Sequence, residues 1–164
     1  DAQHKLSKRN GAASFQDLVA KGYLPDAIIN YIALLGWNPG NDEEIFTLDE
    51  LKKIFTVERL NRSPAIFDIV KLTWMIGQYI RKLSDEEFAA LAMPYIEKVL
   101  RRKDDVATLC KVLQLRIETL GDIPGQIDFL EYVTEYANDL YINKKMKTDV
   151  DIAKQTLAYA LEAL

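Results

Sequence analysis

The sequence predicts an all-α fold, and three observations support this prediction. Apolar residues recur at the spacing of one helical face in several segments. Residues that favour helix starts stand directly before these segments. Apart from short ambiguous pieces, no stretch alternates with the two-residue period of a half-buried strand. With 164 residues, 49% of them hydrophobic and 28% charged, the chain has the size and composition of a globular protein with a buried core.

The first predicted helix covers residues 26–37 and follows Pro25. Its apolar residues lie on one helical face, and Gly36 supplies a natural stop. The residues of that face are Ile28, Tyr31, Ile32 and Leu35. Trp37 is expected to pack against the protein where this helix ends.

Residues that cap helix N-termini stand before the next three predicted helices. Such a residue accepts hydrogen bonds from backbone N–H groups that would otherwise lack a partner. In chain order the caps are Thr47 in a capping box with Glu50, Ser63 followed by the first-turn proline Pro64, and Ser84 in a capping box with Glu87. The second of these helices is predicted over residues 65–83, and Pro94 is expected to kink the third.

Apolar periodicity predicts three more helices towards the C-terminus. They cover residues 106–120 before Gly121, residues 127–141 after Pro124, and residues 149–164. The loops between the predicted helices are rich in Asn, Gly and Pro, which favour turns. The whole chain is therefore expected to be helices joined by short loops.

Metal and nucleophile chemistry find little support in the sequence. His4 and Cys110 are the chain's only histidine and cysteine, and they cannot supply the clustered ligands of a zinc site. Cys110 lies in an apolar helical pattern, so we expect a buried, inert thiol in a reducing compartment. No dinucleotide fingerprint, phosphate loop or nucleophile elbow occurs, and no apolar run approaches the ~18 residues of a membrane span.

Charge is unevenly distributed along the chain. The net charge of −4 argues against a general nucleic-acid binder. Residues 52–82, however, hold seven cations against two anions, and acidic runs flank them on both sides. The cations are Lys52, Lys53, Arg59, Arg62, Lys71, Arg81 and Lys82. Two interpretations stay open, a surface that faces phosphate groups or a set of solvated helix faces.

The basic motif HKLSKRNG stands near the start of the chain. It places Lys5, Lys8 and Arg9 at short spacing, with the Ser7 hydroxyl between them and a glycine at the end. A loop of this kind can close on a polyphosphate and stabilise charge that develops there in a transition state. From the residues alone, a solvated basic terminus is the alternative.

The motif Lys5-Leu6-Ser7-Lys8-Arg9 resembles the KMSKS signature of class I aminoacyl-tRNA synthetases. The continuation, KLSKRNGAASFQDLVAKGYLPDAIINYIALLGW and then SPAIFDIVKLTWMIGQYIR, is similar to glutamyl-tRNA synthetases of the bacterial or organellar type. The resemblance is dense up to Leu83 and weaker from Ser84 onward. One departure is Ile76, where the family commonly has Asn, because isoleucine lacks the donors and the acceptor of that amide.

The resemblance implies an order of domains. Residues 1–12 would be the ATP loop of the catalytic domain, residues 13–83 a helical stem-contact domain, and residues 84–164 the proximal part of a helical anticodon-binding domain. In the family, a parallel-sheet catalytic domain with a HIGH signature lies on the N-terminal side, and no HIGH-like tetrad occurs here. We therefore expect a C-terminal piece of the enzyme that is inactive alone.

The resemblance also implies an activity, the ATP-dependent activation of glutamate and its transfer to tRNA(Glu). Lys8 and Lys5 are the expected catalytic residues at the phosphates, and Ser7 and Arg9 would complete the ATP contacts. ATP, with magnesium in the parent enzyme, would be the cofactor, and none is expected bound to this piece. The parent enzyme is expected to be a cytoplasmic monomer without membrane contact. The expected tRNA contacts are Arg59, Arg62, Lys71, Trp74, Arg81 and Lys82.

Two alternatives to this function stay open. In the first alternative, the chain would be an unrelated all-α interaction module whose basic loop is incidental. In the second, it would be a tRNA-binding accessory module with no catalytic partner domain. The sequence upstream in the full reading frame would separate them, because only the enzyme carries a HIGH-type tetrad there. Trp74 has an alternative too, since an aromatic residue on an apolar helix more often belongs to the core than to an RNA-stacking site.

Overall fold

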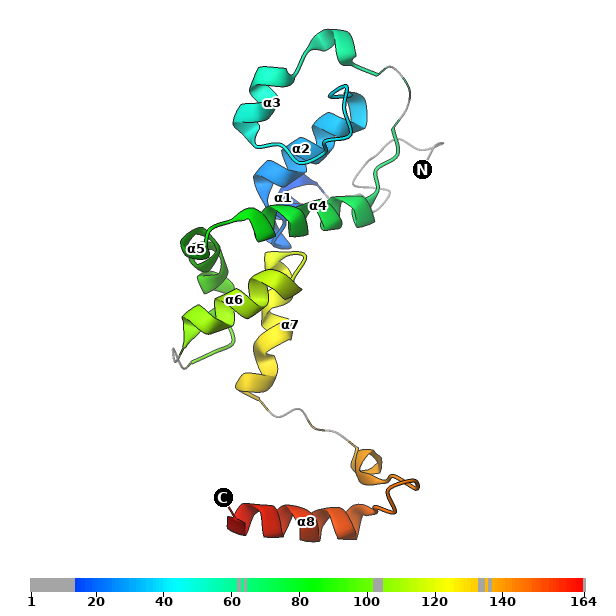
Figure 1. Cartoon of the computed structure of the whole chain (residues 1–164), viewed down its shortest axis with the longest axis vertical. Coiled ribbons are helices and arrows are strands. Elements are labelled where there is room, and N and C mark those ends of the chain that lie inside the picture. The colour runs from blue at the N-terminus through cyan, green and yellow to red at the C-terminus, as the bar shows by residue number, and fades with distance from the viewer. Residues whose placement is uncertain are drawn as a thin grey trace. The chain divides into compact units, whose positions relative to one another are not determined.

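The structure, a computed structural model, describes residues 14–61, 63, 65–101, 105–132, 135 and 137–163. Every regular element within these ranges is a helix, and two isolated β-bridges join Trp37 to Leu60 and Asn143 to Thr148. The predicted all-α class is confirmed. The chain divides into two compact units, Asp1–Glu131 and Tyr132–Leu164, and each is described by itself (Figure 1).

The first unit contains seven α-helices among its described residues. They are α1 (Phe15–Ala20), α2 (Pro25–Gly36), α3 (Leu48–Ile54), α4 (Ile69–Lys82), α5 (Asp85–Ile96), α6 (Val106–Arg116) and α7 (Ile123–Ile127). Short 3-10 turns lie at Val57–Arg59, Leu120–Asp122 and Asp128–Leu130. In the second unit, a 3-10 turn at Asn138–Tyr141 precedes α8 (Val150–Ala163), which confirms the last predicted helix.

The main core of the first unit is built by α2, α4, α5, α6 and α7 together. α4 runs through its centre and buries one face completely, because its apolar residues recur at helical spacing. The fully buried residues of α4 are Leu72, Met75, Ile76 and Ile80. Ile76, the departure from the resembled family, has 0% of its surface exposed, so an apolar side chain suits this position. The boundary expected near residues 82–85 lies inside this shared core, and the family domain boundary there stays a prediction.

A smaller core cluster closes the other side of α2. It consists of Trp37, Phe46 and Leu51, and it joins the end of α2 to α3. Trp37 is the C-cap residue of α2 and is 3% exposed, as expected from its position after the helix. Asn30 ties the two clusters together, since its buried Oδ1 accepts a hydrogen bond from the Phe46 N–H (2.8 Å).

Two of the three predicted caps are confirmed. Thr47 and Glu50 form a reciprocal capping box at the start of α3, and Ser84 and Glu87 form another at the start of α5. Pro94 lies inside α5, as expected. The short helix α1 is not predicted from the apolar pattern, although it begins with a capping box of its own between Ser14 and Asp17.

The predicted start of α4 is wrong. The helix begins at Ile69 rather than at residue 65, and its N-cap is Asp68 instead of Ser63. The Asp68 Oδ1 accepts hydrogen bonds from two backbone N–H groups in the first turn of the helix, those of Val70 (2.8 Å) and Lys71 (3.2 Å).

Contacts with Tyr31 explain why the chain before α4 stays out of the helix. The ring of Phe67 packs edge-on against Tyr31, with 5.4 Å between the ring centroids. The backbone N–H of Asp68 donates to the Tyr31 hydroxyl (2.6 Å) and is therefore unavailable to a helix that starts earlier. Ser63 caps no helix, and its N–H donates to Asn61 Oδ1 (2.9 Å).

The helices predicted over residues 106–120 and 127–141 are also wrong in extent. α6 ends at Arg116, and Pro124 lies inside the short helix α7 rather than before a long one. Residues 128–130 and 138–141 form separate 3-10 turns. The apolar period continues without a helix because its members all reach one core while the backbone turns, namely Leu113, Ile117, Leu120, Ile123 and Ile127.

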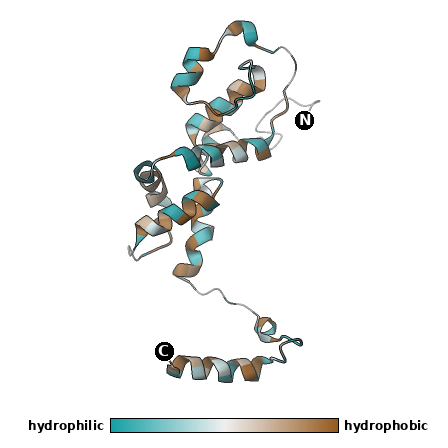
Figure 2. Cartoon of the chain, viewed as in Figure 1, coloured by the Kyte–Doolittle hydropathy of each residue, from teal (hydrophilic) through white to brown (hydrophobic). Residues whose placement is uncertain are grey.

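Apolar and polar residues are mixed along α8, as Figure 2 shows. Its larger apolar side chains, Ile152, Leu157, Tyr159 and Leu161, are exposed. Within the described part of the second unit no residue is buried. None of the helices in the described ranges combines the length and the apolar content that crossing a membrane requires.

Candidate nucleic-acid interface

The predicted ATP loop falls on residues that the structure does not describe. Lys5, Ser7, Lys8 and Arg9 all belong to residues 1–13, and Arg62 lies in a later gap. Their expected contacts with ATP and with tRNA stay predictions. The remaining candidates, which all lie in the first unit, have defined surroundings.

Two of the candidate cations, Arg59 and Lys71, bond to partners within the protein. Arg59, in the turn Val57–Arg59, donates through Nη1 to the carbonyl oxygen of Pro39. Lys71, in the first turn of α4, forms an ion pair with Glu44. Neither group is a fully free charge, so an RNA phosphate would have to share or replace these contacts.

Arg81 is the most tightly held of the candidates. Its Nη2 donates to Glu118 Oε1 (2.8 Å), which joins the last turn of α4 to the segment after α6. The second atoms of this pair, Arg81 Nη1 and Glu118 Oε2, are buried without a hydrogen-bond partner. Gly77 makes room for the pair, because a Cβ at that position would overlap both groups.

Lys82 and Lys53 differ from these cations, because neither forms an ion pair or hydrogen bond in the part of the chain that the structure covers. Both lie near Glu50 in α3. The backbone N–H and hydroxyl of Thr47 hold the pKa of Glu50 below its usual value, and the charges of Lys82 and Lys53 lower that pKa further. The end of α4 and the end of α3 therefore each present an exposed lysine side chain whose charge acts on Glu50.

Trp74 is accessible rather than part of the core. It projects from α4 with 45% of its surface exposed, and Val70, one turn earlier, is 74% exposed. The expectation that an aromatic residue here more often belongs to the core is wrong for Trp74. The same expectation holds for Tyr79 of α4, which is partly buried and packs against the core. Its hydroxyl donates to Asn30 Oδ1 (2.7 Å) and to the Phe46 carbonyl oxygen.

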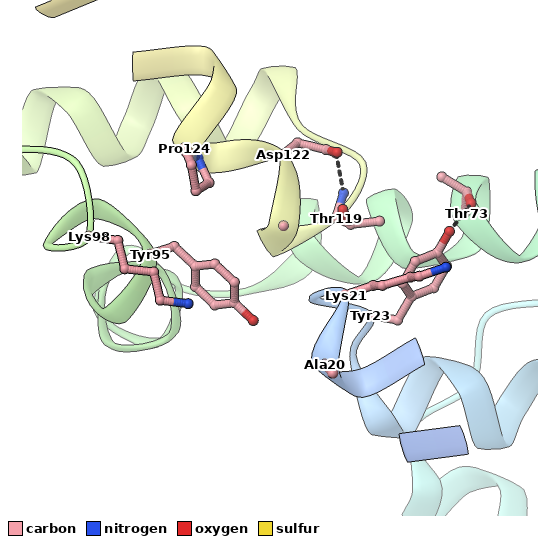
Figure 3. A pocket seen from close by; sticks show the side chains of 10 residues that line it. Ala20, Lys21, Tyr23, Thr73, Tyr95, Lys98, Thr119, Asp122 and Pro124 are labelled. Carbon is pink, nitrogen blue, oxygen red and sulfur yellow. Dashed lines mark hydrogen bonds between the residues drawn. The ribbon is translucent and has the colours of Figure 1, made fainter. Parts of the chain in front are cut away.

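An open pocket of about 490 Å³ lies in the first unit, between the α1–α2 turn, α4, the end of α5 and the start of α7 (Figure 3). The lining residues with polar side chains are Lys21, Tyr23, Thr73, Tyr95, Lys98, Thr119 and Asp122. Two of them satisfy each other, since the hydroxyls of Tyr23 and Thr73 lie 2.8 Å apart. Asp122 Oδ2 accepts from the backbone N–H groups of Glu118 (3.1 Å) and Thr119 (2.7 Å).

Two glycines hold the walls of this pocket together. Gly22, at a φ of 88°, lies against the backbone of Leu120 and Gly121, and a Cβ on either glycine would overlap the other segment. The Leu120 N–H donates to the Gly22 carbonyl oxygen (3.0 Å). No local sequence pattern marks this pocket, because its residues come from segments far apart in the chain.

Metal and thiol chemistry remain without a site in the described ranges. No group of three or more His, Cys, Asp or Glu side chains there is placed to hold a metal ion. Cys110 is buried, as expected, and burial raises the pKa of its thiol. A thiol that ionises late is a poor nucleophile.

Comparisons with known protein families define the class. Residues 1–74 match the family described as class I tRNA synthetases (E and Q), catalytic domain, and residues 87–164 match the family described as an anticodon binding domain. The chain therefore carries two successive segments of a class I tRNA synthetase.

The curated relatives are more specific. The chain is 54% identical over 157 residues to the glutamate–tRNA ligase of Clostridium kluyveri, which covers 96% of this chain and 32% of that protein. It is 52% identical over 164 residues to the glutamate–tRNA ligase of Clostridium tetani, which covers 100% of this chain and 34% of that one. The chain belongs to the glutamate–tRNA ligase family. It spans about a third of the length of these relatives.

Solved structures share the fold. A glutamate tRNA ligase from Elizabethkingia meningosepticum, crystallised in complex with its amino acid, matches 100% of this chain and 36% of its own with a TM-score of 0.74. A glutamate-tRNA synthetase from Elizabethkingia anophelis matches 87% of this chain and 32% of its own with a TM-score of 0.68. Both are 24% identical in sequence, so they support the helical fold alone.

Proposed function

We propose that the chain is the tRNA-binding portion of a glutamate–tRNA ligase. The observation that carries this proposal is the identity of 54% with such a ligase over 96% of the chain, joined to the anticodon-binding family match. In the whole enzyme, glutamate is activated with ATP and then transferred to tRNA(Glu). Lys8 and Lys5 act on the phosphates, and Ser7 and Arg9 complete the ATP contacts with magnesium bound by the nucleotide.

Contacts within the protein support an order of importance among the proposed tRNA contacts. Lys82 has an ammonium group without a protein partner in the described ranges, and Trp74 presents an exposed ring. Phosphate contacts of this kind orient the RNA without reading its sequence, and an exposed aromatic ring can stack on an unpaired base. Arg59, Lys71 and Arg81 contribute less, because each would have to give up or share a contact within the protein.

Titration of labelled tRNA(Glu) with the chain at several salt concentrations tests this proposal. We expect affinity in the range of ~10⁻⁴ to 10⁻⁶ M and a steep loss with salt, because binding releases counterions from phosphates. Lys82→Ala should reduce the slope of log affinity against log salt by slightly less than one unit. Trp74→Ala should weaken binding at every salt concentration and leave that slope unchanged.

Control variants separate RNA contact from protein stability. Lys111→Ala removes one exposed cation on α6 that pairs with Asp85 (3.6 Å) and is not a proposed RNA contact, so it should leave the salt slope at the wild-type value. The triple variant Lys71→Ala, Arg81→Ala and Lys82→Ala should flatten the slope further, but its folding must be checked since Arg81 holds Glu118. Failure of the wild-type chain to bind tRNA(Glu) at low salt would overturn the proposal.

We further infer a monomer in the cytoplasm. Sedimentation of the purified chain should give a single species near its mass of 18.7 kDa. A larger species that persists on dilution would contradict the monomer.

A further inference from the structure

We propose that the pocket of Lys21, Tyr95 and Lys98 binds a phosphodiester group of the RNA backbone. The inference rests on the proposed function, since it assumes that RNA is the partner. It adds a site that lies outside the basic stretch of residues 52–82 and that neither family match assigns to a role. The pocket lies at the junction of the two matched segments, because Lys21 belongs to residues 1–74 and Tyr95 and Lys98 belong to residues 87–164.

The pocket contains hydrogen-bond donors that have no partner among the residues the structure describes. The ammonium groups of Lys21 and Lys98 and the hydroxyl of Tyr95 make no hydrogen bond or ion pair with any residue the structure describes. The Lys98 Nζ lies 4.7 Å from the centre of the Tyr95 ring, so the ring holds this cation without neutralising it. The Tyr95 hydroxyl and the Lys98 ammonium lie on the α5 side of the pocket, where they suit the anionic oxygens of a phosphodiester, and Lys21 adds positive charge on the opposite side (Figure 3).

The lining of the pocket carries more positive than negative charge. The residues that line the pocket include two cations and one anion, Asp122. One oxygen of that carboxylate is already engaged, because Asp122 Oδ2 accepts two backbone N–H groups at 2.7 and 3.1 Å. The surplus of positive charge therefore faces the opening, which favours an anion over a neutral or cationic ligand.

Backbone and side-chain contacts hold the walls of the pocket in place. The Gly22–Gly121 approach and the hydrogen bond from Leu120 to Gly22 fix the α1–α2 turn against the segment before α7. The Tyr23–Thr73 hydrogen bond fixes the same turn against α4. Figure 3 shows Tyr95 and Lys98 on the α5 side of the pocket and Lys21 on the other. A ligand that meets preformed walls loses less free energy in ordering them.

The size of the opening agrees with this ligand. At about 490 Å³ it is in the range of small-molecule sites and exceeds the need of a single inorganic ion. A phosphodiester with its neighbouring sugars would fill it from the open side, which an extended strand or a groove edge of RNA can reach.

The test is a titration of labelled tRNA(Glu) with wild-type chain and three variants at several salt concentrations. Lys21→Ala with Lys98→Ala should lower the salt slope by about one to two units, one for each cation removed. Tyr95→Phe keeps the ring and the charge, so it should weaken binding roughly three- to tenfold without changing the slope. Lys111→Ala with Lys154→Ala is the control, since it removes two exposed cations outside the pocket, one of them paired with Asp85 (3.6 Å).

Each outcome decides the matter. The inference stands if the pocket variants lose slope and affinity and the control does not. If the wild-type chain binds tRNA but the pocket variants match the control, this inference fails and the proposed function stands. If the wild-type chain does not bind tRNA, both fail. If millimolar inorganic phosphate shifts the NMR signals of the pocket residues while tRNA binding ignores the pocket variants, the site takes a free anion and the inference is overturned.

Discussion

Gly77 lies on α4 beneath the ion pair of Arg81 and Glu118. A Cβ at this position would overlap both charged groups, so the pair depends on a residue without a side chain. Both groups are the ends of flexible side chains that can move, and alanine is favoured over glycine in a helix interior by about 1 kcal/mol. We therefore expect Gly77→Ala to displace the ion pair, to change the free energy of unfolding by less than about 1 kcal/mol, and to be less favourable than Gly36→Ala. Urea unfolding followed by circular dichroism measures this change.

Gly36 supplies the control for that experiment. It is the last residue of α2, and a Cβ there would meet no atom within 4 Å. Gly36→Ala should leave stability unchanged or raise it slightly, because alanine has less freedom than glycine to lose on folding. An equal change in both variants would show that the effect at Gly77 does not come from crowding of the ion pair.

Two tyrosines, the buried Tyr31 and the partly buried Tyr79, predict a loss of stability in alkali. Burial raises the pKa of Tyr79 above the ordinary value for tyrosine, and burial is also the main cause of the raised pKa of Tyr31. In the unfolded chain both phenols ionise near pH ~10, while the folded protein keeps them protonated. The stabilising effect is therefore complete below pH ~10 and is lost as the pH rises above that value.

Unfolding free energies on both sides of pH ~10 test this prediction, with Tyr79→Phe as the comparison. The variant loses the hydrogen bond to Asn30, so it should be less stable by about 1 kcal/mol at neutral pH. It should also lose less stability in alkali than the wild type. A parallel decline of both proteins would assign the alkaline effect to other groups.

At the scale of the element, the N-cap of α4 separates the sequence prediction from the structure. Asp68→Ala removes the acceptor of two backbone N–H groups and should cost about 1 kcal/mol of stability. Ser63→Ala should change stability by less than ~0.5 kcal/mol, because Ser63 caps no helix. The reverse order of the two effects would support a helix that starts at residue 65.

Elements defined by neighbouring residues were predictable from the sequence, and elements defined by distant contacts were not. The capping boxes at Thr47 and Ser84 use partners three residues away, so the sequence displays both halves. The start of α4 depends on Tyr31, which lies 37 residues before Asp68. The turn after Arg116 is concealed by an apolar period that continues because the turning segment packs on the same core.

The same distinction applies to the candidate interface. The chemistry of the basic stretch follows from its composition, but its free and engaged cations do not. Lys71 meets Glu44 from 27 residues away, and Arg81 meets Glu118 from 37 residues away. The pocket of Lys21, Tyr95 and Lys98 forms only because two glycines bring remote turns together, and a sequence pattern does not display such a contact.

At the scale of the whole molecule, all the buried core residues that the structure describes belong to the first unit. A chain that ends after Glu131 keeps both core clusters and the ion pair of Glu131 with Arg101. We expect it to unfold cooperatively in urea, with a midpoint close to that of the whole chain. Loss of cooperative unfolding in this truncated chain would show that residues 132–164 contribute to the core of the first unit.

The glycine contact between Gly22 and Gly121 also limits how the chain can be recombined with its relatives. A chimaera joined between residues 74 and 87 would take the two family-matched segments from different parents. It would then have to inherit the two glycines as a matched pair from separate sources, and a junction placed after Arg81 would separate Arg81 from Glu118 as well. A junction between Glu131 and Tyr132 separates none of these pairs, so it is the natural crossover point for exchange between relatives.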